Sequence, residues 1–116
     1  MDKKKTISEE EARKSADEIA RKKADEIAKE EADTRARKEA DERAKKKADK
    51  QAKKAARYAG EEDYNEAYYE VYVDAYREAF DEAYRDAYDR AYKDSFDEAY
   101  KEAFDEAYVE ILNDKD

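Results

Sequence analysis

A strict four-residue repeat constrains the fold of this chain more than any other feature of its sequence. In the first half, Ala recurs at every fourth position without a break from Ala12 to Ala56. In the second half the repeating unit is acid–Ala–aromatic, and its small column runs from Ala67 to Ile111. Because residues four apart lie on nearly the same side of an α-helix, the repeat predicts two long helices. The aromatic column of the second half ends on a leucine and consists of Tyr64, Tyr68, Tyr72, Tyr76, Phe80, Tyr84, Tyr88, Tyr92, Phe96, Tyr100, Phe104, Tyr108 and Leu112.

The two predicted helices meet at Gly60, the only glycine in a chain without proline. Capping-box patterns that start at Thr6 and at Ser8 predict that the first helix begins near these residues. Gly60 is the expected left-handed stop of this helix and the turn residue of the fold. The second helix is expected from about Tyr64 to Leu112. The alternative is one continuous helix, because a single glycine inside a helix costs only about 1 kcal/mol.

The two halves of the chain differ in charge. Residues 1–60 hold 20 basic and 15 acidic side chains, a net charge of +5, while residues 61–116 hold 6 and 20, a net charge of −14. The predicted fold is therefore an all-α antiparallel hairpin of a basic, Ala-rich helix (1–60) and an acidic helix with the Tyr/Ala repeat (61–116). Such a hairpin should bring the basic end of the first helix beside the acidic start of the second. These charges are Lys45, Lys46, Lys47, Lys50, Lys53 and Lys54 on one side and Glu61, Glu62, Asp63, Glu66, Glu70 and Asp74 on the other.

Further columns of charged residues follow the same period. Two of them alternate in sign, from Arg13 to Lys53 and from Arg77 to Asp105. We interpret both as solvated faces, in which each i,i+4 ion pair adds about 0.2–0.5 kcal/mol to its helix. A third column, from Glu66 to Glu106, is almost entirely acidic. We expect acids of this column on neighbouring helices to accept hydrogen bonds from buried tyrosine hydroxyls.

The period itself predicts how the helices pack. Four residues advance an α-helix by about 400°, so a column drifts by roughly 40° per repeat. Keeping such a column against one partner needs a right-handed supercoil with a pitch of roughly 54 Å, compared with about 150 Å for two-stranded coiled coils. We therefore expect either local underwinding of the second helix or an aromatic column that meets different neighbours at different heights. The second option favours a multi-helix bundle, layer or filament.

Several function classes are disfavoured by what the sequence lacks. There is no Cys and no His, which removes thiolate chemistry, the usual general base and the commonest ligands of transition metals. We expect no enzyme activity, no cofactor and no specific metal site. The basic stretch lacks interleaved aromatics and the whole chain has a net charge of −9, which disfavours nucleic acid as a partner. No apolar run reaches the ~18 residues of a membrane span, and the expectation is a soluble, intracellular protein.

The leading functional prediction is a structural subunit that self-assembles into homo-oligomers through the aromatic column, from Tyr64 to Leu112. One alternative is a rigid helical spacer or docking module that binds another helical protein. Another is a designed or low-complexity helical sequence without an evolved function. Concentration-dependent size without any partner separates the first prediction from the others.

Overall fold

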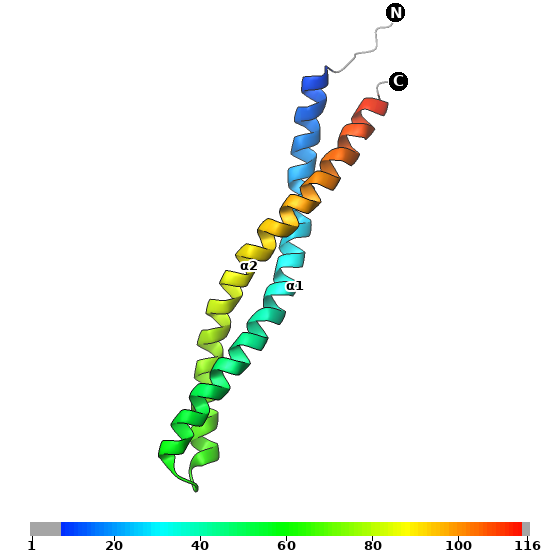
Figure 1. The fold of residues 1–116 in the computed structure, drawn as a ribbon. Helices are drawn as coiled ribbons and strands as arrows, with labels where there is room; N and C mark the ends of the chain where they lie inside the picture. Colours follow the sequence, from blue (N-terminus) through cyan, green and yellow to red (C-terminus); the bar gives the residue numbers. More distant parts are fainter. Residues whose placement is uncertain (1–7, 115–116) are drawn as a thin grey trace, which may run out of the picture. The chain divides into compact units, whose positions relative to one another are not determined.

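The computed structural model describes residues 8–114, which form two long α-helices joined by one turn (Figure 1). Helix α1 spans Glu9–Ala59 and helix α2 spans Tyr64–Asn113. Within residues 8–114 there is no β-strand. The predicted all-α helical hairpin is thus confirmed, and the alternative of one continuous helix is wrong.

The start of α1 is fixed by a capping box. The Glu11 backbone N–H donates to Ser8 Oγ at 3.1 Å, while the Ser8 backbone N–H donates to Glu11 Oε1 at 3.2 Å. Each side chain thereby satisfies a backbone donor that the first helical turn leaves without a partner. Of the two capping patterns in the sequence, the one at Ser8 is used; Thr6 lies outside the described residues.

The turn depends on the backbone of Gly60. Its φ angle is +89°, in the left-handed region that glycine adopts without steric cost. A Cβ atom added at Gly60 would have no neighbour within 4 Å, so the conformation and not the available space requires glycine. Residues 61–63 complete the turn, and the Ala67 N–H donates to the Asp63 carbonyl at 2.9 Å to open α2.

The chain divides into two compact units, and each contains a part of both helices. The turn unit is Ala32–Arg90, and the end unit combines Met1–Glu31 with Ala91–Asp116. In the turn unit the two helices run antiparallel from the turn at Gly60 (Figure 1). In the end unit the first part of α1 pairs with the last part of α2, again antiparallel, as the contacts described below establish.

The core of both units is a seam of alanines. Every fourth residue of α1 from Ala12 to Ala56 is fully buried, and the matching column of α2 from Ala75 to Ala107 is 3–9% exposed. No large side chain within residues 8–114 is fully buried. Because methyl groups fill so little space, two helices that meet through alanine can approach to the short end of the usual range of about 8–10 Å between axes. The four-residue repeat therefore specifies a close pair of helices.

Within each unit, the aromatic column of α2 has the same neighbour, α1, from one repeat to the next. In both units the alanine column of α2 is buried and the neighbouring aromatic column contacts α1. Rows of residues four apart are inclined to the helix axis, so two helices that pack such rows together must cross or wind around each other to stay in contact. Figure 1 shows α1 and α2 crossing within the turn unit.

Candidate functional site

The aromatic column of α2 forms a continuous stack of rings in each unit. Consecutive ring centroids lie 5.7–6.4 Å apart from Tyr64 to Tyr88 in the turn unit. In the end unit they lie 5.8–6.0 Å apart from Tyr92 to Tyr108. All residues of the predicted column, including Leu112, are half-buried. We call this column the aromatic stripe: one of its edges packs against α1 and the other reaches the surface.

Tyrosine hydroxyls of the stripe donate to aspartates of α1. In the turn unit the pairs are Tyr68–Asp49, Tyr76–Asp41 and Tyr84–Asp33, each with 2.5 Å between oxygens. In the end unit Tyr92 donates to Asp25, and Tyr100 donates to Asp17. Every step of eight residues forward on α2 is matched by eight residues backward on α1. We call these five hydrogen bonds the Tyr–Asp ladder.

Each aspartate of the ladder also binds a cation one turn further along α1. These i,i+4 ion pairs are Arg21–Asp17, Lys29–Asp25, Arg37–Asp33, Lys45–Asp41 and Lys53–Asp49, with N–O distances of 2.9–3.1 Å. The pKa of each of these five carboxyl groups is lowered below 3.8. The largest cause is the hydrogen bond from the tyrosine hydroxyl, and the next is the hydrogen bond from the cation. The aspartates raise the pKa of Tyr68 and Tyr76 to about 12, and they raise the pKa of Tyr84 and Tyr100 as well.

The ladder corrects two sequence-based interpretations. The column from Arg13 to Lys53 does form the predicted i,i+4 ion pairs, but its aspartates face α2 and are not merely a solvated surface. The hydroxyl acceptors are these aspartates of the same chain, whereas the acidic column from Glu66 to Glu106 accepts none of the five hydrogen bonds. The earlier interpretation failed because it treated each helix separately and did not use the register that the turn sets.

The choice between Tyr and Phe in the stripe follows the same register. Phe80, Phe96 and Phe104 are the three phenylalanines of the chain. In the register of the ladder, each of them lies at a step where α1 carries an arginine, namely Arg37, Arg21 and Arg13. A ring opposite an arginine needs no hydroxyl, whereas a ring opposite an aspartate uses one. Tyr64, Tyr72 and Tyr88 lie at steps where α1 carries a lysine, so the signal in the sequence is that no phenylalanine occurs at an aspartate step.

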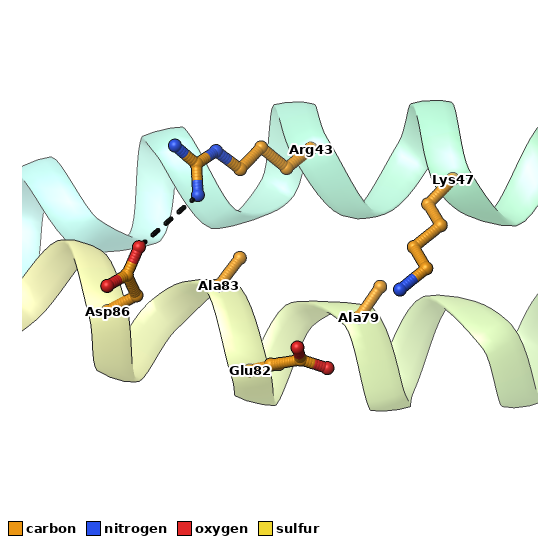
Figure 2. A pocket seen from close by; sticks show the side chains of 6 residues that line it. All are labelled: Arg43, Lys47, Ala79, Glu82, Ala83 and Asp86. Carbon is orange, nitrogen blue, oxygen red and sulfur yellow. Dashed lines mark ion pairs between the residues drawn. The ribbon is translucent and has the colours of Figure 1, made fainter.

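A second, sparser seam lies on the other side of the alanines. In the turn unit Arg43 pairs with Asp86 at 3.6 Å, and Arg90 pairs with Glu39 at 2.9 Å. In the end unit Lys23 pairs with Glu106 at 3.6 Å. A groove of about 380 Å³ lies at this seam in the turn unit. Figure 2 shows the side chains that line it and the ion pair by which Arg43 of α1 reaches Asp86 of α2. The side chains of these three ion pairs are more than one-third exposed, so each pair adds little to stability.

The predicted attraction between the basic end of α1 and the acidic start of α2 does not produce ion pairs. Among the described residues, Lys45 and Lys53 bind aspartates of α1 itself, and the acids from Glu61 to Asp74 form no ion pair. The groove of the second seam continues toward the turn along Lys47, Gln51 and Glu78. Of the predicted basic end, Lys47 thus lies in the same groove as acids of α2, without an ion pair to them among the described residues.

Near the turn, apolar side chains extend the stripe onto the outer face of α2. Tyr69 is 70% exposed and Val73 is 46% exposed. Tyr72, Val73, Tyr76 and Phe80 line a shallow depression of about 280 Å³, which Arg77 and Asp81 border. All the residues that line this depression belong to α2.

Comparison with protein-family models, with curated proteins and with solved structures gives no match. In residues 8–114 no three His, Cys, Asp or Glu side chains are grouped so that they could hold a metal ion. Neither α1 nor α2 combines the length and apolar character that crossing a membrane requires.

One position interrupts the alanine seam and gives a test of its packing. Ser95 takes the place of an alanine, is 3% exposed, and its Oγ has no hydrogen-bond partner among the described residues. Ser95→Ala should raise the free energy of unfolding by about 1–2 kcal/mol, because it removes an unsatisfied hydroxyl and improves helix propensity. Urea denaturation followed by circular dichroism measures this change. The control Ser15→Ala, at an exposed site of α1, should give at most about 0.5 kcal/mol; equal gains at both positions would contradict a buried cost at Ser95.

Proposed function

We propose that this chain is a structural helical hairpin that self-associates through the exposed edge of the aromatic stripe. The observation that carries the proposal is the state of the stripe: an uninterrupted stack of rings in each unit that α1 covers only on one side. Large contiguous apolar surfaces on soluble proteins usually mark interaction sites. The partner proposed is a second copy of the chain.

The charges beside the stripe support a second copy as the partner. The outer column of α2 alternates in sign at every step, through Arg77, Asp81, Arg85 and Asp89 in the turn unit. The same alternation follows in the end unit, from Lys93 to Asp105. An alternating column is complementary to itself, because a copy shifted by one step meets an opposite charge at each position. Such charges favour a defined register between two identical surfaces.

Removing apolar side chains from the stripe and from the depression beside it tests the proposal. In the variant Tyr72→Gln/Val73→Gln/Phe80→Gln, three residues that line the depression become polar, and none of them donates to the Tyr–Asp ladder. Self-association should weaken roughly a hundredfold or more, since each buried side chain of this kind contributes about 1.5–3 kcal/mol and 1.4 kcal/mol corresponds to a factor of ten. Sedimentation velocity over a wide concentration range measures the change.

The control is Tyr58→Gln, because Tyr58 is 85% exposed and lies outside the stripe. This variant should assemble like the unmodified chain. A wild-type protein that stays monomeric at every concentration would overturn the proposal and favour the rigid spacer. Assembly that persists in the triple variant would show that the stripe is not the interface.

A further inference from the structure

A row of lysines on α1 near the turn has no partner in its own chain. Lys46, Lys50 and Lys54 are exposed, follow each other at four-residue spacing, and form no ion pair within residues 8–114. Each of them lies two residues, or about 200°, from the buried alanines of the seam. This lysine row therefore faces away from α2 and from the acids that α2 carries.

A row of acids on α2 is in the same situation. Glu66, Glu70 and Asp74 are exposed and also follow each other at four-residue spacing, without an ion pair in the described part of the chain. The Arg43–Asp86 pair fixes which residues of α1 lie opposite this acid row. Continued toward the turn, the same register places neutral residues of α1 there, with Ala55 opposite Asp74. The acid row is thus left without a cation by the sequence of α1.

We propose that the lysine row of one copy docks on the acid row of a second copy, as an electrostatic contact separate from the aromatic stripe. Charge complementarity supports this assignment. Both rows advance by four residues, about 6 Å, so three lysines can align with three acids step for step. This inference rests on the proposed function, because its partner is again a second copy of the chain. The contact itself uses none of the stripe residues.

The physical character of this contact sets how it should respond to salt. Exposed ion pairs contribute little individually, and their attraction is screened over about 8 Å at physiological ionic strength but over about 30 Å at 0.01 M. Association through the two rows should therefore be strongest at low salt. An apolar contact through the stripe responds much less to the same change.

Charge reversal on each row, followed by mixing, tests the contact. The variants Lys46→Glu/Lys50→Glu/Lys54→Glu and Glu66→Lys/Glu70→Lys/Asp74→Lys should each lose about tenfold or more in self-association at low salt, because attraction becomes repulsion. An equimolar mixture of the two variants should restore association, since each then meets a row of opposite sign. Sedimentation velocity on the separate variants and on the mixture measures both effects.

A matched control uses other lysines of the same column. Lys14→Glu/Lys22→Glu/Lys38→Glu changes the net charge equally, at positions outside the lysine row, and should associate like the unmodified chain. Circular dichroism of every variant establishes that the helices still form. Failure of the mixture to associate better than its components would overturn the contact.

The stripe variant separates this inference from the proposed function. In a Tyr72→Gln/Val73→Gln/Phe80→Gln background, the charge-reversed pair should still associate on mixing at low salt, which would support the contact even if the stripe proposal failed. A different occupant is tested with a single-stranded oligonucleotide as probe. Binding of this polyanion that requires the lysine row, combined with self-association that ignores the acid row, would overturn the contact between copies.

Discussion

Replacing Ala44 with leucine is expected to lower the free energy of unfolding by about 1–3 kcal/mol, the usual cost of adding methylenes to a closely packed site. Ala44 is fully buried in the alanine seam. Ala79 of α2 is 7% exposed and lies as far beyond Asp63 as Ala44 lies before Gly60. The double variant Ala44→Leu/Ala79→Leu therefore places both larger side chains at the same level and should cost more than either change alone.

The measurement is urea denaturation of the turn-unit variants, followed by circular dichroism. Glu42→Leu is the matched control, because it introduces the same side chain at an exposed position of the same helical turn and should change stability by no more than about 0.5 kcal/mol. If Ala44→Leu and Glu42→Leu were equally stable, the helices could not be in close contact at the seam.

The helices were predictable because their signals are local. The alanine and aromatic columns, the capping box at Ser8 and the single glycine at residue 60 each act over a few residues, and the structure has α1 and α2 within about one residue of the predicted ends. The buried position of the alanine column follows from the same repeat. Local rules sufficed for these features because the four-residue repeat is regular over most of both helices.

The contacts between the helices were less predictable because they depend on register. Asp33 has a complete local explanation in its ion pair with Arg37, and nothing within α1 indicates that Tyr84 also binds it. The net charges of the two helices were misleading in a similar way. Opposite net charges do not determine on which face of each helix the charged side chains lie. Lys50 and Glu70 illustrate this: both belong to the predicted pair of charged groups, yet neither forms an ion pair in the described residues.

Alkaline pH is expected to destabilise the hairpin through the Tyr–Asp ladder. Hydrogen bonding to aspartate raises the pKa of Tyr68 and Tyr76 from 10.0 to about 12. The folded protein thus holds these protons more tightly than the unfolded chain does, so the contribution to stability is complete below pH 10 and is lost as the pH rises through about 12. At the acid end, the aspartate pKa is lowered, and the contribution is complete above pH 3.8 and declines below it.

The test compares the unmodified chain with a variant in which the five ladder tyrosines, Tyr68, Tyr76, Tyr84, Tyr92 and Tyr100, become phenylalanine. Helical circular dichroism and tyrosinate absorbance are recorded together as the pH is raised. The unmodified chain should lose helix between pH 10 and 12 as the tyrosines ionise. The five-Phe variant should be less stable at neutral pH, because it leaves five aspartates without their hydroxyl donors, but should retain more of its own stability across that window.

The control Tyr58→Phe/Tyr69→Phe removes two exposed tyrosines that donate to no aspartate among the described residues. It should follow the unmodified chain at every pH, which separates ionisation in the ladder from general loss of tyrosine. Equal neutral-pH stability of the five-Phe variant, together with an unchanged alkaline transition, would mean that the ladder adds nothing to folding. Register would then depend on the alanine seam alone, and the occurrence of tyrosine opposite each of these aspartates would have no energetic basis.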